Sequence, residues 1–342
     1  MRSARSLAIG LYVAVSVLQF HVPAQAKQKP HAKPQRTHIV QGTAQLAGEN
    51  GKFDVTYTLD KNSPLNFTLL SASYSPSRLV IGNICTFPRV DQKMLVINFT
   101  VQNPQHTDFN YDWSAIKFTV LDPDGTSYDR SADVGKAGTH IRAGVSLKPG
   151  QKFAAYTGFV VPEGAKIVKL IADRGNPPVL RVNLAGHIKP LTAPFADPAD
   201  PTGATCLSNI PAKAGVYYPS GDLDVRYDSA AFVDGPLGYV HADQGNRLYV
   251  ATYTIRNMIP SSVGYQPGLV ELTLQTSDGE KETPMTVLKT IRNEQLGEQL
   301  SPGDEYTARA VFQLPQNVTG KSLTFGEGNY GKKYTVDVSA AH

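Results

Sequence analysis

The sequence has few of the residues that build metal centres, disulfide frameworks and nucleophilic active sites. Its 342 residues include two cysteines, one tryptophan and eight histidines, and no two histidines stand at a metal-ligand spacing such as His-x3-His. No Gly-x-Ser-x-Gly elbow is present, and neither cysteine stands beside a histidine. These absences argue against a zinc site and against the commonest forms of covalent catalysis, and nothing in the sequence calls for a cofactor.

Long apolar runs are also lacking, apart from one at the N-terminus. Leu7–Phe20 carries no charge, follows Arg2 and Arg5, and precedes the small-x-small pattern Ala24-Gln25-Ala26. The run is too short for a bilayer, which takes about 20 apolar residues, but it suits a secretory signal peptide. We therefore predict a signal peptide over residues 1–26 and a secreted or periplasmic protein with no integral membrane segment after cleavage. The alternative is an N-terminal anchor that stays on the chain.

Net charge is small once the ends are set aside. The formal net charge at pH 7 is +4, yet the signal peptide holds two positive charges and no acid. The stretch 27–38 holds four more and no acid, which leaves −2 for the rest of the chain. The cationic residues of 27–38 are Lys27, Lys29, Lys33 and Arg36. A body with this balance gives no reason to expect nucleic-acid binding.

Residues 27–38 are predicted to form a disordered basic tail, because they are polar, cationic and contain proline. The plain interpretation is a solvated spacer. The alternative is a weak electrostatic contact with an anionic envelope polymer or with a membrane surface.

Cys85 and Cys206 are the only cysteines, and an exported protein meets an oxidising compartment that permits one bridge between them. Such a bridge would close a loop of about 120 residues, which is worth roughly 4–5 kcal/mol if the disulfide acts through chain entropy. The alternative is two separate buried thiols.

The strongest feature that is present is an internal repeat. Both halves contain an alternating apolar segment that ends on asparagine, Val96–Asn103 and Tyr249–Asn257. An offset of 154 residues relates Asn103 to Asn257, Tyr111 to Tyr265 and Asp124-Gly125 to Asp278-Gly279. After one deleted residue, an offset of 153 relates Pro149-Gly150 to Pro302-Gly303, Phe159 to Phe312 and Pro162 to Pro315. The chain therefore carries a duplicated domain.

The repeated unit is predicted to be a β-sandwich. Alternation such as Phe99 and Val101 places apolar side chains on one face of a strand, and Asp-Gly marks a tight turn. No amphipathic helical pattern is long enough to cover a sheet, and turn signals recur about every ten residues. The predicted fold class is all-β, with two tandem immunoglobulin-like β-sandwich domains. Domain 1 covers 39–193 with an extra N-terminal hairpin, an exposed linker covers 194–214, and domain 2 covers 215–342.

The order of these features resembles a known family. An alternating strand ends at Asn103, Tyr111 follows in a loop, and then come Asp124-Gly125, Leu147-x-Pro149-Gly150 and Phe159-x-x-Pro162. This order is similar to the bacterial secreted immunoglobulin-like domain family of unknown function, which is grouped with the mycobacterial immunoprotective extracellular antigen. The resemblance covers roughly 65–185 and 222–339. It implies an immunoglobulin-like sandwich in the cell envelope or the medium, with no catalytic residues to transfer. The two copies and the missing lipobox cysteine depart from the usual pattern.

Phe109, Tyr111 and Trp113 are the candidates for ligand contact. Spaced by two, they share one face of an extended segment, and stacked aromatic rings can make a sugar-binding platform. Tyr111 recurs as Tyr265, which points to a structural role, whereas Trp113 is replaced by Pro267 and is peculiar to the first copy. Packing in the core or at a strand edge is the alternative.

Asp122, Asp124 and Asp129 form a weak candidate for a Ca²⁺ site, since Asp122-Pro123-Asp124-Gly125 resembles the start of a calcium loop. The further oxygen ligands and the terminal Glu of an EF-hand are missing, and the second copy keeps only the turn residues. A turn without metal is therefore the preferred interpretation.

These features favour a non-catalytic exported cell-envelope protein whose sandwiches act as protein-interaction or spacer modules. The expected partner is an unknown envelope or extracellular protein. The first alternative is a carbohydrate-binding protein that uses the aromatic face of domain 1. The second is a hydrolase whose site assembles from distant residues.

Overall fold

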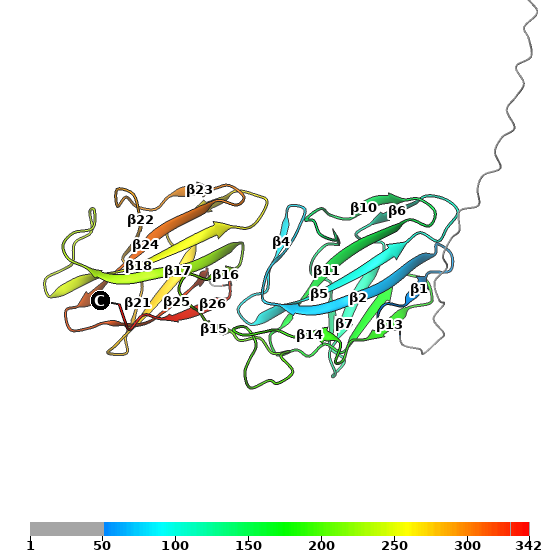
Figure 1. Ribbon diagram of the computed structural model, residues 1–342, viewed down its shortest axis with the longest axis horizontal. Coiled ribbons are helices and arrows are strands. Elements are labelled where there is room, and N and C mark those ends of the chain that lie inside the picture. The colour runs from blue at the N-terminus through cyan, green and yellow to red at the C-terminus, as the bar shows by residue number, and fades with distance from the viewer. Residues whose placement is uncertain (1–50, 329, 342) are drawn as a thin grey trace, which may run out of the picture. The chain divides into compact units, whose positions relative to one another are not determined.

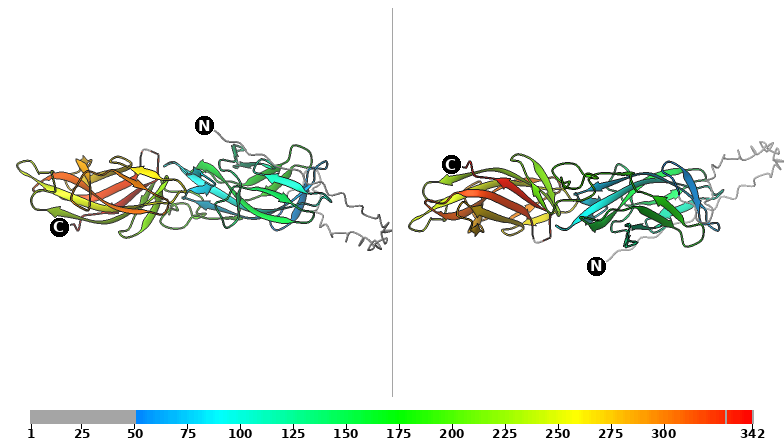
Figure 2. Two further views of the ribbon diagram at one scale, coloured as in Figure 1. Left: turned by 90° about the horizontal axis from the view of Figure 1, so that it is seen from above. Right: turned by 90° about the horizontal axis from the view of Figure 1, so that it is seen from below.

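The computed structural model describes residues 51–328 and 330–341, and within them every regular element is a strand. The predicted signal peptide and basic tail lie outside the described residues, as does the first half of the expected N-terminal hairpin. No helix in the described ranges is long and apolar enough to cross a membrane. The strands of the two copies run from blue to green and from yellow-green to red in Figure 1, and Figure 2 shows them from above and below.

The first copy is a sandwich of two main sheets. One sheet has the order β1 (Thr56–Leu59), β2 (Leu65–Ser75), β5 (Gln92–Gln102), β11 (Lys152–Pro162) and β9 (Gly135–Lys136), with β14 (Ile188–Lys189) parallel to β2. The other has the order β13 (Leu180–Asn183), β12 (Lys169–Asp173), β7 (Lys117–Leu121) and β8 (Ser127–Asp129). Two short pairs complete it, β6 (Phe109–Asp112) with β10 (Gly144–Leu147) and β3 (Leu79–Ile81) with β4 (Ile84–Thr86).

The second copy repeats this plan. One sheet has the order β16 (Tyr217–Ser220), β17 (Leu223–Val233), β18 (Asn246–Asn257), β24 (Glu305–Pro315) and β22 (Thr286–Lys289). The other has the order β15 (Asn209–Pro211), β26 (Lys333–Asp337), β25 (Gly320–Glu327), β20 (Val270–Thr276) and β21 (Lys281–Glu282). A short pair joins β19 (Val263–Tyr265) to β23 (Glu298–Leu300). The prediction of two tandem all-β sandwiches is confirmed.

Each copy has its own hydrophobic core, formed by the inward-facing residues of both sheets. In the first copy three phenylalanine rings meet at its centre, with Phe99 lying 5.4 Å from Phe67 and 5.0 Å from Phe118 between ring centroids. The alternating burial of β7 and β20 reflects the period-2 pattern of their sequences, because successive side chains of a strand point to opposite faces. Burial of these apolar side chains is the main stabilising contribution to each sandwich.

The repeated asparagines connect the end of the long central strand to the following loop and to the end of β10 or β23. Asn103 is fully buried, and its Nδ2 donates to the carbonyl oxygens of Thr107 and Leu147, both at 2.8 Å. Its equivalent Asn257 donates to the carbonyl oxygens of Ser261 at 2.8 Å and Leu300 at 3.1 Å. Buried carbonyl groups need such partners, which explains why this residue recurs.

The segment that follows the first copy differs from the exposed linker that its composition predicts. Ala204 and Cys206 are buried and belong to the core of the first copy, and Ala196 forms a β-bridge with Cys206. Asn209–Pro211, in turn, forms β15 and pairs with β26. The Pro, Ala, Asp and Gly of the segment make tight turns that fold it back onto the sandwiches, so composition alone was misleading here.

Candidate functional site

The three aromatic residues proposed for ligand contact do not present a common exposed face. Tyr111 is 1% exposed, and its ring lies 5.7 Å from that of Phe153 between centroids. Phe109 packs partly buried against the same core, with the guanidinium of Arg174 5.1 Å from its ring centroid. Alternation along β6 therefore turns both inward. Trp113 lies beyond the end of β6 and is 39% exposed.

Trp113 is covered by two arginines. The guanidinium carbon of Arg142 lies 4.7 Å from the ring centroid and that of Arg130 lies 5.3 Å away, while Arg130 also donates to the carbonyl oxygen of Trp113. Arg142 is held in turn by a salt bridge of 2.9 Å to Asp133. These cation–π contacts occupy ring surface that a stacked sugar would need.

The two cysteines are free thiols in the structure, so the expected bridge is not formed. Cys85 lies half-exposed on the short strand β4, whereas Cys206 is buried in the core of the first copy. Burial raises the pKa of both thiols, which keeps them protonated at neutral pH. A protonated thiol is a poor nucleophile, and neither cysteine is a candidate for covalent chemistry.

The three aspartates of the calcium hypothesis serve the turn instead. Asp122 accepts hydrogen bonds from the Thr126 amide at 2.8 Å and from the Tyr128 hydroxyl at 3.1 Å. Asp129 accepts from the hydroxyl of Thr119 at 2.9 Å, and Asp124 follows in the exposed turn. Across 51–328 and 330–341, no group of three His, Cys, Asp or Glu side chains is placed to hold a metal ion.

A groove at one open side of the sandwich occurs at equivalent positions in both copies. In the first copy it is lined by Ser114, Ile116, Lys117, Phe118, Asp129 and Arg130. The residues 154 positions later, Gly268, Val270, Glu271, Leu272, Thr283 and Pro284, all line the groove of the second copy. The cavity is about 280 Å³ in the first copy and about 430 Å³ in the second. The groove is therefore a feature of the repeated fold.

The wall of the second groove is a sheet edge with free backbone groups. β20 pairs with β25 along its length, but its other neighbour β21 reaches only Leu274 and Gln275. Gly328 donates to the carbonyl of Leu269 at 3.0 Å on the β25 side, so Val270 and Leu272 direct their N–H and C=O groups to the opposite edge. Among the described residues, no strand lies beside that stretch of the edge.

In the first copy the same edge has a partner at Phe118. Arg130 donates its backbone N–H to the carbonyl oxygen of Phe118 at 3.3 Å. The equivalent pair in the second copy is Pro284 and Leu272, and proline has no N–H to donate. The chain then crosses to the other sheet in both copies, where Ser131 donates to Gly158 at 3.0 Å and Met285 to Val311 at 2.8 Å. One residue exchange thus removes the donor to the carbonyl oxygen at this edge.

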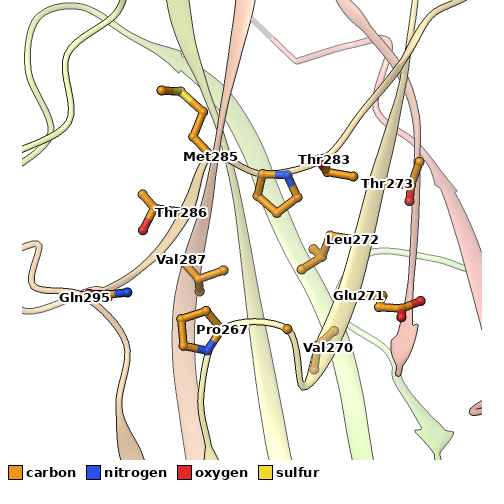
Figure 3. Close-up of a pocket in the computed structure, with 12 residues that line it drawn as sticks. Pro267, Val270, Glu271, Leu272, Thr273, Thr283, Met285, Thr286, Val287 and Gln295 are labelled. Atoms are coloured by element: carbon orange, nitrogen blue, oxygen red, sulfur yellow. The ribbon is translucent and has the colours of Figure 1, made fainter. Parts of the chain in front are cut away.

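The two grooves also differ in charge. Lys117, Asp129 and Arg130 line the first, whereas Glu271 is the only charged residue lining the second and is paired with Lys333 at 2.8 Å. Figure 3 shows the hollow of the second groove between Val270 and Leu272 on β20 and Val287 on β22, with Pro267 and Met285 at its rim. Sequence reasoning did not find this groove, although the repeat alignment contains its signal in the exchange of Arg130 for Pro284.

Comparison with known proteins identifies the family of this chain. No match was found among curated proteins. Among solved structures, an uncharacterized β-sandwich protein from Clostridium difficile 630 is 16% identical, covers 36% of this chain and 91% of its own, and gives a TM-score of 0.29. The yjhA protein from Bacillus subtilis is 14% identical, covers 36% of this chain and 97% of its own, and gives a TM-score of 0.26. The sequence profile of a domain of unknown function, DUF4352, matches residues 61–178 and 217–336, so the chain belongs to that family and carries two copies of its domain.

Proposed function

We propose that this protein is a non-catalytic, exported cell-envelope protein whose sandwiches act as protein-interaction modules and spacers. The observation that supports it best is the unpaired edge of β20 beside an apolar groove. Native proteins usually protect such edges, because free backbone groups recruit another strand. An edge that one copy closes and the other leaves open suits a binding surface. Export rests on the signal-peptide pattern of residues 1–26.

The described residues give little support to the hydrolase alternative. No histidine in 51–328 and 330–341 hydrogen bonds a serine hydroxyl or a carboxylate, and the one histidine side-chain bond joins His140 Nδ1 to the carbonyl oxygen of Val80 at 3.1 Å. A general base needs to reach the nucleophile whose proton it takes. A panel of esterase, glycosidase and peptidase substrates tests this alternative, and turnover would contradict the proposal.

The interaction proposal is tested by recovery of partners from an envelope extract. The mature protein 27–342 is compared with the tail-less form 39–342, at low salt and at about 0.15 M salt, where the Debye length falls to about 8 Å. We expect both forms to recover the same protein at both salt concentrations, since the sandwiches carry the binding. Recovery by the longer form alone, and only at low salt, would assign binding to the basic tail and an anionic polymer.

Carbohydrate binding remains a second candidate, because Trp113 is exposed as that function requires. Arg142 and Arg130 cover its ring, so a sugar has to displace a guanidinium. The only tryptophan of the chain makes the test simple. A saturable change in its fluorescence on titration with envelope polysaccharide would support this candidate, and a flat titration would remove it.

A further inference from the structure

We infer that the groove of the second copy binds an extended, uncharged peptide segment of a partner protein, which adds to β20 as a further strand and places an aliphatic side chain in the groove. This inference rests on the proposed function as an interaction module. It names the chemistry of the partner segment and restricts the site to one of the two copies.

The backbone supplies the first argument. Val270 and Leu272 offer two N–H and two C=O groups along one edge, at the spacing that a neighbouring strand uses. Pro284 cannot close this edge as Arg130 closes the first copy's. An extended peptide satisfies all of these groups at once, and main-chain hydrogen bonds of this kind provide affinity in strand addition.

The side chains supply the second argument. Val270 and Leu272 point into the sandwich, and Glu271 and Thr273 point outward. Alternate residues of an added strand would therefore enter the groove, where Val287 is buried and Met285 is 53% exposed. An aliphatic side chain placed there would be covered by apolar surface, and this burial is favourable.

The charge of the lining residues indicates that the groove of the second copy, rather than that of the first, binds an uncharged segment. The second groove contains Glu271 as its only charged lining residue, and Lys333 already pairs with it. A charged peptide residue in the groove would find no partner, and desolvating an unpaired charge is costly. In the first copy Lys117, Asp129 and Arg130 line a smaller groove, so an apolar segment fits there less well.

A second copy of this chain is a poorer occupant than a separate peptide. Pairing of β20 with β20 of another molecule would place that molecule's Val270 and Leu272 beside the groove. The side chains of these residues are already buried in their own core. Such a pair would satisfy the backbone but leave both grooves without a side chain. The groove therefore favours a segment whose apolar residues have no core of their own.

The test uses the mature protein and an octapeptide of alternating Val and Thr, with fluorescein on its N-terminal amine and an amidated C-terminus. We expect saturable binding by fluorescence anisotropy with one peptide per chain. A peptide with proline at one of its two middle positions loses an N–H, and we expect it to bind at least about tenfold more weakly, a difference of about 1.4 kcal/mol. This comparison leaves the protein unchanged, so it does not depend on the folding of a variant.

Variants locate the site. Pro284→Ala and Pro284→Arg restore an N–H opposite Leu272, and Met285→Asp puts a charge at the groove rim, so each is expected to weaken binding at least about tenfold, or 1.4 kcal/mol. Val216→Asp is the matched control, because Val216 is 43% exposed and precedes β16. β16 and β22 are the two edge strands of the same sheet, and the groove lies beside β22. The control variant should bind as the wild type does.

The outcomes separate this inference from the proposed function. Equal binding of the proline-containing peptide, or equal binding by the three groove variants, overturns strand addition at β20. A concentration-dependent dimer that Met285→Asp abolishes would make a second copy the occupant and also overturns it. In either case, the proposed function as an interaction module is retained if wild type and Met285→Asp recover the envelope protein equally well. Loss of all recovery would remove the proposed function itself.

Discussion

The two copies of the repeat agree in their scaffold and differ at the groove. Asn103 and Asn257 make the same pair of hydrogen bonds, one to the following loop and one to the end of a later strand. Arg130, in contrast, supplies a backbone donor to the sheet edge that its equivalent Pro284 lacks. Residues that satisfy buried backbone groups were retained in both copies. Residues around the open side were free to diverge, which indicates that the copies share a fold but need not share a ligand.

A second difference between the copies is a pair of equivalent residues with opposite charge, each of which hydrogen bonds the backbone at the start of a long strand. Arg174 of the first copy donates to the carbonyl oxygens of Ser63 and Ala115, both at 3.0 Å. Its equivalent 153 residues later is Glu327, whose Oε2 accepts from the amides of Asp222 at 2.6 Å and Leu223 at 3.2 Å. Both side chains hold the start of the first long strand of a copy, β2 or β17, in place. Only the carboxylate makes this contact depend on pH in the ordinary range.

The largest expected effect tests the shared scaffold. Asn257→Ala removes both buried donors, leaves the carbonyls of Ser261 and Leu300 unsatisfied, and should lower the free energy of unfolding by about 3 kcal/mol. Asn103→Ala should cost the same within about 1 kcal/mol, since its bonds are equivalent. Urea denaturation measures both. A large loss of unfolding free energy for only one of the two variants would show that the two asparagines are not equivalent.

The next effect separates Glu327 from Arg174. Burial, with a contribution from Asp222, raises the pKa of Glu327 to about 7 from its ordinary 4.5. The folded state then holds this proton more tightly than the unfolded state, so the contribution of Glu327 to stability is greatest below pH 4.5 and is lost as pH rises through about 7. Glu327→Gln keeps an acceptor oxygen and should be more stable than wild type at pH 8 by about 2 kcal/mol, but not at pH 4.

Thermal unfolding of the wild type, Glu327→Gln and the control Arg174→Gln across this pH range measures the difference. The Arg174 variant should show a pH-independent change, because its partners are neutral carbonyls. A stability difference between wild type and Glu327→Gln that stays constant from pH 4 to pH 8 would contradict the assignment.

A smaller effect concerns the closed edge. Arg130→Pro removes the N–H that bonds Phe118, and it should lower the free energy of unfolding by about 1 kcal/mol more than Arg130→Ala, which keeps that N–H. Both variants lose the guanidinium over Trp113, so the difference reports the backbone bond together with the restriction that proline places on φ. Chemical denaturation checks it. Equal stability of the two variants would mean that the first edge is not closed in this way.

The smallest effect is at Trp113, which the second copy replaces by Pro267. Arg142→Ala uncovers part of the indole ring, and the lost cation–π contact should cost about 0.5 kcal/mol, the range of an exposed contact, in addition to the lost salt bridge to Asp133. Acrylamide should quench the fluorescence of this variant more strongly than that of wild type. Arg142→Lys is the matched control, and unchanged quenching in Arg142→Ala would show that the guanidinium does not shield the ring.

Periodicity and the internal repeat predicted the fold from the sequence, but they did not predict the groove beside β20. The alternation that placed Phe109 and Tyr111 on one face was read correctly, yet it could not show that this face is the core or that the strand ends at Asp112, before Trp113. The exchange of Arg130 for Pro284 is visible in the sequence. Its consequence depends on the register of β8 and β21, which decides that Arg130 lies opposite Phe118.

The central claim is that the edge of β20 is open and receives a strand while the equivalent edge of β7 is closed. Hydrogen exchange of the mature protein, resolved to single amides and recorded with and without the alternating Val-Thr peptide, tests it most directly. Unbound, the Val270 and Leu272 amides should exchange rapidly although their side chains are buried, and the Arg130 amide should be protected. With peptide, protection should rise at Val270 and Leu272 and stay unchanged around Phe118. Slow exchange of Leu272 without peptide, or equal protection of both copies with it, would contradict the account.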